Sequence, residues 1–425
     1  MTRAGQATRS LVYFAIAAAL PGAALAYPLD GYPETGIRRL EGIRLAQLGL
    51  VKDVKEPPGA LLATPEVDLR LAGQTFDLPA PDLELTRQVA ATLGGRLEAY
   101  GFALLDLTDP AHPRYAEHRG DYRQNVGSVG KLLVALALYQ ALADLHPDDV
   151  AARQRILKET VVVADGFSQH DHHTVRLFDP ATRTVKRRPV QIGDRGSLYE
   201  WVDWMLSPSS NSAAGMVMRE AMLLRRYGAS YPPPEAEIRR FFDETPRPEL
   251  TELLRNTFFE PVTRNGLDLE FFRQASFFTA GGNRKVPEAG NSYGTARELM
   301  RYLLRLEQGR VVDAWSSRDI KRLLYVTERR IRYAASPALA DAAVYFKSGS
   351  LWECAPEAGF VCHQYAGNVK NYMNSTAIVE SPARGRRLFY MTTLVTNVLR
   401  KNSASEHQAL ATRFHRLVEK MHEER

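Results

Sequence analysis

Residues 127–145 read Gly-Ser-Val-Gly-Lys and then Leu-Leu-Val-Ala-Leu-Ala-Leu-Tyr-Gln-Ala-Leu-Ala-Asp-Leu, and this stretch decides the fold. The part from Leu132 to Leu145 is apolar nearly all round, which is typical of a helix buried on every side. Ser128 precedes this helix, at the end where the helix dipole favours developing negative charge. Lys131 follows three residues later, one turn on and on the same face. The stretch therefore predicts a central buried helix that begins with a serine and a lysine.

A serine and a lysine in this arrangement can act as a nucleophile and its base. A lysine that begins an apolar helix is partly desolvated, and desolvation lowers the pKa of an ammonium group. Lys131 could then accept the proton of the Ser128 hydroxyl. The same spacing also arises by chance, as a helix-capping serine followed by a solvated lysine. The pair alone leaves both interpretations open.

Two further polar groups lie at the ends of expected elements. Ser209-Ser210-Asn211 stands in a turn between two expected helices, and Lys347-Ser348-Gly349-Ser350 ends an expected strand over residues 342–347. Gly349 leaves room for the backbone of a ligand beside that strand. The alternatives are an ordinary helix-capping loop and an ordinary turn at the end of a strand.

The order of expected elements predicts an α+β fold, in which an α/β sandwich with one antiparallel sheet carries an inserted all-helical domain. Strands are expected both before and after a long helical stretch at about 130–290, so the sheet is built from both ends of the chain. The expected strands are 100–107, 115–118, 342–347, 360–367, 375–380 and 387–396. The expected helices are 84–97, 132–145, 150–160, 197–206, 212–227, 235–243, 250–257, 295–308, 317–325 and 405–423.

The first 26 residues have the three parts of a secretory signal. Arg3 and Arg9 supply positive charge, residues 11–20 are apolar, and Ala24-Leu25-Ala26 offers a cleavage site after Ala26. A run of ten apolar residues is too short to span a membrane. We therefore expect a signal peptide at 1–26, an N-terminal extension at 27–80 and a catalytic domain at 81–425. The mature protein is expected to be periplasmic or secreted, with no transmembrane segment; its oligomeric state stays open.

Composition narrows the class of protein. The chain has 425 residues, of which 45% are hydrophobic and 24% charged, and this balance excludes a wholly disordered, collagen-like or coiled-coil protein. The formal net charge of +6 hints at an anionic partner, but an exported protein does not meet chromosomal DNA. We therefore expect no nucleic-acid partner.

The chain has two cysteines, Cys354 and Cys362, with seven residues between them. In an oxidising compartment a disulfide is favoured over two free thiols. The segment between them has turn residues, which predicts a bond that closes the tip of a β-hairpin. A metal site there would need more ligands, and only His363 is near.

The three polar motifs, in this order, resemble those of the active-site serine penicillin-recognising superfamily, which includes class A β-lactamases and D,D-peptidases. The resemblance covers about residues 84–425. It implies a β-lactamase/transpeptidase-like fold and acyl transfer from a β-lactam or from the D-Ala-D-Ala stem peptide of peptidoglycan, with no cofactor. The implied roles are an acylated nucleophile (Ser128), its base (Lys131), a proton donor to the leaving nitrogen (Ser209), a partner of the substrate amide (Asn211), holders of the substrate carboxylate (Lys347 and Ser348) and an oxyanion hole (the N–H groups of Ser128 and Ser350).

One part of the family pattern is missing. Class A β-lactamases carry a glutamate that activates the deacylating water, about fourteen residues before the position of Thr295. Residues 277–285 contain no carboxylate, and Glu270 and Glu288 lie outside the pattern. This absence favours a peptidase or a slow β-lactamase. The alternative is a non-catalytic cell-wall binding or scaffolding protein on the same fold, against which the intact Ser128–Lys131 pair argues.

A cluster of histidines remains. His170-Asp171-His172-His173 has ligand atoms suited to zinc, but it lacks a recognisable distant ligand. We therefore expect no metal, and we interpret the segment as a solvated or cleft-lining loop. The basic run at 183–188 that follows is expected to be a solvated hairpin that could meet an anionic polymer.

Overall fold

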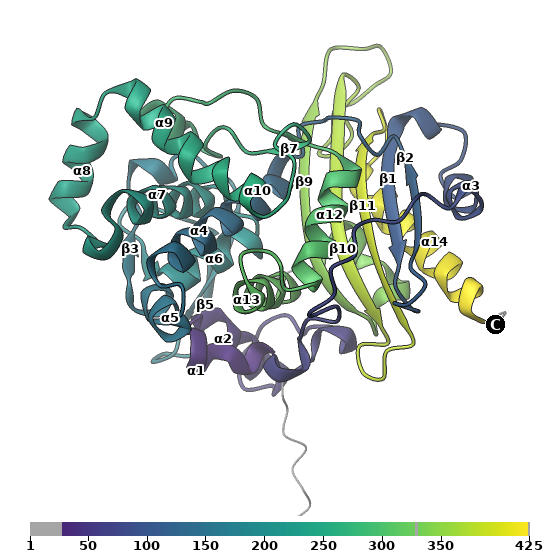
Figure 1. The fold of residues 1–425 in the computed structure, drawn as a ribbon, viewed down its shortest axis with the longest axis horizontal. Coiled ribbons are helices and arrows are strands. Elements are labelled where there is room, and N and C mark those ends of the chain that lie inside the picture. Colours follow the sequence, from purple (N-terminus) through teal and green to yellow (C-terminus); the bar gives the residue numbers. More distant parts are fainter. Residues whose placement is uncertain (1–27, 328–329, 424–425) are drawn as a thin grey trace, which may run out of the picture.

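The structure is a computed structural model, and it describes residues 28–327 and 330–423. The expected signal peptide lies outside the described residues. A sheet with its covering helices forms one side of the molecule, and a group of helices from the middle of the chain forms the other (Figure 1). The long helix α14 (Ser403–Glu423) lies along the sheet near the end of the chain.

The main sheet is antiparallel throughout and is built from both ends of the chain, which confirms the predicted α+β fold. Its strand order is β2-β1-β11-β10-β9. The strands are β1 (Tyr100–Asp106), β2 (Arg114–His118), β9 (Ala343–Glu353), β10 (Lys370–Ser381) and β11 (Leu388–Asn397).

Both faces of this sheet are buried against apolar cores. Because side chains alternate along each strand, a single strand contributes to both cores. Ala103 and Leu105 of β1 belong to the larger core, which the sheet shares with the helical side. Phe102 and Leu104 belong to the second core, under α14 and α3 (Leu83–Ala91). Strands buried on both faces read as continuous apolar runs, which is why β1 could be recognised in the sequence.

The middle of the chain is mostly helical but not all-helical, so that part of the prediction was wrong. Three short antiparallel pairs interrupt the helices: β3 (Val161–Val163) with β6 (Arg195–Ser197), β4 (Thr174–Asp179) with β5 (Thr184–Pro189), and β7 (Phe272–Arg273) with β8 (Tyr293–Gly294). The strands of the first and third pairs have two or three residues and are too short to show a period in the sequence. The second pair is the hairpin expected at 183–188. The remaining helices are α1 (Tyr32–Thr35), α2 (Arg38–Gln47), α4 (Lys131–Leu145), α5 (Val150–Glu159), α6 (Leu198–Leu206), α7 (Asn211–Tyr227), α8 (Glu235–Glu244), α9 (Arg247–Phe258), α10 (Glu260–Arg264), α11 (Ala280–Lys285), α12 (Ala296–Glu307) and α13 (Ala314–Tyr325).

Helix α4 is the buried helix that its sequence predicts. Its residues from Lys131 to Gln140 are all buried, and it contacts α6, α7, α9 and α10. The helical stretch Gly127–Leu145 is long and apolar enough to cross a membrane, but 78% of its most apolar window is buried inside the protein. We interpret it as a core helix on that ground.

The disulfide is present, but the expected strand at 360–367 is not. Cys354 and Cys362 are bonded, with their Cα atoms 6.1 Å apart. Strand β9 continues to Glu353, and residues 354–369 form a loop that leads directly into β10. Val361 in this loop is exposed, so its apolar side chain has no core to enter, and the local pattern was misleading.

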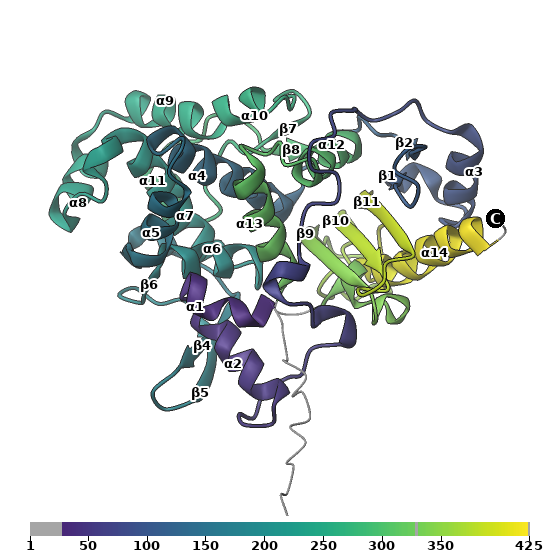
Figure 2. The ribbon, with the colours of Figure 1, turned by 60° about the horizontal axis from the view of Figure 1, so that its bottom comes forward.

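The N-terminal segment 28–80 packs along the junction between the helical side and the sheet (Figure 2). Arg39 of α2 is buried and pairs with Asp203 of α6, at 2.5 Å between Nε and Oδ2. Farther along, Arg70 pairs with Glu380 of β10. The segment therefore ties the two sides of the molecule together.

Candidate active site

The three polar motifs meet around one cavity of about 620 Å³. Each comes from a different element: a 3-10 turn over Gly127–Gly130 that leads into α4, the turn between α6 and α7, and strand β9. The motif residues that line the cavity are Ser128, Ser209, Asn211, Ser348, Gly349 and Ser350.

Lys131 is buried below this cavity and contacts two of the motifs. Its Nζ donates to Ser128 Oγ at 2.9 Å, to Asn211 Oδ1 at 2.7 Å and to the carbonyl oxygen of Ser209 at 2.7 Å. Burial lowers its pKa to about 7; the charge of Asp171 opposes this effect and that of Arg332 adds to it. Lys131 is therefore a buried amine beside a serine hydroxyl, and the solvated-lysine alternative is excluded.

Ser209 stands between two lysines. Lys347 Nζ donates to Ser209 Oγ at 2.7 Å, and Lys131 Nζ lies 3.3 Å from the same oxygen. Burial holds the pKa of Lys347 well below its usual range, and the charges of Lys131 and Arg332 add to this effect. Ser209 has a positive φ of 66°, so its turn holds an uncommon backbone conformation at the site.

Arg332 adds a third cation that the sequence did not reveal. It begins a 3-10 turn, Arg332–Ala335, and donates to Ser348 Oγ at 2.7 Å and to Ser350 Oγ at 3.0 Å. Among the described residues that line the cavity, none is an aspartate or a glutamate. The excess of positive charge suits an anionic ligand.

Gly349 allows β9 to lie against the turn that carries Ser128. A Cβ atom at this position would be 2.5 Å from the backbone nitrogen of Ser128, and it would also collide with the carbonyl oxygen of Val126. Backbone atoms cannot rotate away as a flexible side chain can, so any larger residue would push the strand and the turn apart. The glycine is thus required by close backbone approach.

We expect Gly349→Ala to lower any activity that depends on Ser128 by about 10²-fold, because a shift of about 1 Å at a reacting group has effects of this size. The matched control is Gly95→Ala, where the added methyl group meets open space. The measurement is the rate of covalent modification of Ser128 by a fluorescent penicillin. Equal rates in both variants would contradict the role given to Gly349.

Asp171, one of the residues considered as a zinc ligand, instead accepts hydrogen bonds at the start of α7. Its Oδ2 accepts hydrogen bonds from Ser210 Oγ at 2.9 Å and from the N–H groups of Asn211 at 2.7 Å and Ser212 at 3.1 Å. Burial opposes its charge, but hydrogen bonds from His173 and from backbone N–H groups hold its pKa well below the usual range. Asp171 therefore caps α7 and fixes the backbone of Asn211.

The carboxylates considered as deacylation bases lie elsewhere. Glu270 is exposed and pairs with Arg123, and neither Glu270 nor Glu288 lines the cavity. Gln274 lines it instead, with its side-chain oxygen against Gly130. An amide offers no proton-accepting group comparable to a carboxylate. The family pattern predicts the glutamate later in the chain, within residues 277–285, so no motif identifies Gln274 in the sequence.

Comparison with known proteins gives one family and several similar folds. The sequence model of a family described as "Beta-lactamase enzyme family" matches residues 84–370. A representative class A β-lactamase from Bacteroides cellulosilyticus is 14% identical with a TM-score of 0.50, over 80% of this chain and 98% of that one. PBP-A is 14% identical with a TM-score of 0.48, over 81% of this chain and 100% of that one. A β-lactamase from Sphaerobacter thermophilus is 15% identical with a TM-score of 0.47, over 77% of this chain and 93% of that one. No curated protein matches this chain.

Proposed function

Because this chain belongs to the beta-lactamase enzyme family, we propose that it is a serine hydrolase that forms an acyl-enzyme on Ser128. The substrate is a β-lactam or a peptide that ends in D-Ala-D-Ala. One observation carries the proposal: the buried amine of Lys131, with a pKa of about 7, lies 2.9 Å from the Ser128 hydroxyl. A base with a pKa near the working pH is the most effective proton acceptor.

Acylation follows from these contacts. Lys131 takes the proton of Ser128, and the Ser128 oxygen attacks the substrate carbonyl. The backbone N–H groups of Ser128 and Ser350 hold the negative charge that develops on the carbonyl oxygen, a contribution of about 10²–10³ in rate for each donor. Ser209, between the two lysines, passes a proton to the leaving nitrogen, and Asn211 receives the substrate amide.

The substrate carboxylate is held by the groups on and beside strand β9. Lys347, Ser348 and Arg332 supply positive charge and a hydroxyl there, and Ser350 adds a second hydroxyl. A carboxylate would stabilise the charged forms of the two buried cations, whose pKa values are lowered mainly by burial. Both a penicillin and a D-Ala-D-Ala peptide carry a carboxylate near the scissile amide.

A fluorescent penicillin tests the proposal. We expect covalent labelling of the mature protein and complete loss of labelling in Ser128→Ala. If the intact protein takes up no label and does not hydrolyse nitrocefin, the chain is a non-catalytic binding protein on this fold. Because no acidic side chain among the described residues lines the cavity, we expect slow release of the label, as in a peptidase or a weak β-lactamase.

The proposed location is the periplasm or the outside of the cell. The disulfide between Cys354 and Cys362 is consistent with export, because such bonds persist in oxidising compartments. N-terminal sequencing of the protein from the producing cell is expected to begin at Tyr27. An N-terminus that still includes Arg3 and Arg9 would show that the signal peptide is not removed and would contradict export.

The acylation rate should depend on pH through Lys131. Its free amine is lost as the pH falls through the pKa of about 7, so the rate constant for labelling should fall about tenfold for each pH unit below that value. Above it, the rate should level off. The measurement is the second-order labelling constant as a function of pH, and a profile that stays flat down to about pH 5 would exclude Lys131 as the base.

A further inference from the structure

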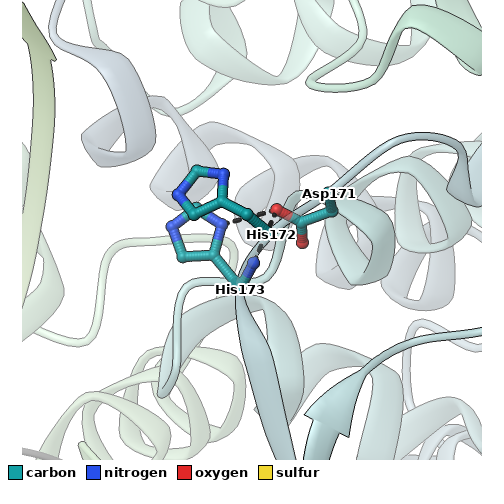
Figure 3. A group of neighbouring side chains, drawn as sticks. All are labelled: Asp171, His172 and His173. Carbon is teal, nitrogen blue, oxygen red and sulfur yellow. Dashed lines mark hydrogen bonds and ion pairs between the residues drawn. The ribbon is translucent and has the colours of Figure 1, made fainter.

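The segment His170–His173 brings a histidine–carboxylate pair to the wall of the cavity (Figure 3). Nδ1 of His173 lies 2.6 Å from Oδ1 of Asp171, and the backbone N–H of His173 donates to the same oxygen at 3.1 Å. His172 and His173 both line the cavity, but only His173 is paired with the carboxylate. The two rings stack, with their centres 4.3 Å apart.

The contacts of Asp171 argue against a metal here. Asp171, His172 and His173 each have a ligand atom within 4.8 Å of the others, which is close enough for one ion. Both carboxylate oxygens, however, already accept hydrogen bonds: Oδ2 from three donors at the start of α7 and Oδ1 from His173. A metal would have to displace these donors and leave the start of α7 without its cap. The carboxylate is better suited to orienting an imidazole.

Pairing with Asp171 also determines which nitrogen of His173 is basic. An ionised carboxylate accepts the proton of Nδ1–H, so Nε2 carries the free lone pair. In Figure 3 this second nitrogen points away from Asp171. The side chain of His173 is 28% exposed, so water can reach it. Burial lowers the pKa of His173 and the charges of Lys131 and His172 add to this effect, while Asp171 opposes it; the ring is thus neutral near pH 7.

We propose that His173, oriented by Asp171, is the general base that activates the water for deacylation, in place of the missing glutamate. The inference rests on the acyl-enzyme of the proposed function. Nε2 takes a proton from water as the water oxygen bonds to the ester carbon. The tetrahedral intermediate then collapses and breaks the bond to Ser128 Oγ. The hydroxyl of the water ends on the product acid, and the proton taken by His173 ends on the restored Ser128 hydroxyl.

Among the cavity-lining residues described in the structure, the alternatives to His173 are poor. No carboxylate lines the cavity, Gln274 is not basic, and Arg332 does not lose its proton in this pH range. His172 is exposed, whereas His173 is half-buried and held by Asp171. Asp171, which orients His173, also accepts a hydrogen bond from the backbone N–H of Asn211, and Asn211 Oδ1 accepts one from Lys131 Nζ. Two hydrogen bonds therefore connect the carboxylate behind the imidazole to the amine beside Ser128.

The test separates formation of the acyl-enzyme from its loss. In His173→Asn, the amide N–H can keep the bond to Asp171 but cannot accept a proton. We expect its labelling rate with a fluorescent penicillin to stay within about threefold of the original, while the rate of label release falls by about 10²-fold or more. The matched control is His170→Asn in the same segment, whose side chain is exposed and does not line the cavity. Both of its rates should be unchanged.

Label release by the original protein should decline as the pH falls below the pKa of His173, and this limb should be absent from His173→Asn. If all three proteins are labelled and release label equally fast, the role of His173 is wrong while the acyl-enzyme stands. If the original protein takes up no label, the proposed function itself fails. Loss of release on treatment with EDTA, restored by zinc, would replace the proposal with a metal site.

Discussion

Lys131→Met is expected to slow acylation of Ser128 by about 10²–10⁴-fold, the range that a positioned general base supplies. Methionine has a similar length and fills the same space, but it cannot accept a proton. The fold should survive, because the buried ammonium that is removed is itself costly; its burial is what brings the pKa of Lys131 to about 7. Asn211 Oδ1 and the Ser209 carbonyl lose a donor, which costs about 1–3 kcal/mol in the free energy of unfolding.

A second variant distinguishes proton transfer from positive charge. Lys131→Arg keeps the cation but does not release a proton at neutral pH, so it should be as slow as Lys131→Met. The measurements are the second-order labelling constant and, on the same samples, the thermal unfolding midpoint. Labelling of either variant within tenfold of the original rate would mean that another group takes the proton of Ser128.

Arg39→Met is expected to lower the free energy of unfolding by about 3–5 kcal/mol, because it leaves the buried carboxylate of Asp203 without its main cation. Both side chains are almost inaccessible to solvent, at 1% and 0% exposure. Arg39 also donates to the carbonyl oxygen of Val326, so the loss extends to the end of α13. A loss of this size would show that the N-terminal segment is an integral part of the fold.

The control is Arg44→Met on the same helix. Its ion pair with Glu41 lies within α2 and is partly exposed, and such pairs contribute less than about 1 kcal/mol. Urea unfolding of the two variants gives both values. A loss of less than about 1 kcal/mol in Arg39→Met would show that residues 28–80 are an accessory segment.

Much of the fold could be predicted from local pattern. Helix α4 and strand β1 have continuous apolar runs, because each is buried on every side. The strand expected at 360–367 was wrong for the converse reason: its apolar residues lie in an exposed loop, and local sequence does not record what lies opposite a side chain. Strands β3 and β6 were missed because a three-residue pairing is decided by its partner. The hairpin expected at 183–188 is present, as β4 paired with β5.

The sequence predicted those residues of the candidate site that belong to its three motifs. Ser128, Lys131, Ser209, Asn211 and Lys347 could be named because each group is contiguous in the sequence and begins or ends an element. Arg332, Gln274 and the cap formed by Asp171 belong to no such pattern. Each reaches the site from a distant segment, and only the packing of β9 and α7 brings them there.

The sequence by itself thus determined the buried helix, the antiparallel sheet drawn from both ends of the chain and the three groups of polar residues. Spacing along a helix or strand is local, so these features can be read from neighbouring residues. The tertiary structure alone decided the state of those residues: how deeply Lys131 is buried, which oxygens it contacts, and which carboxylate orients His173. Burial and electrostatic interaction depend on groups far apart in the chain, and these two effects set the pKa values on which the chemistry depends.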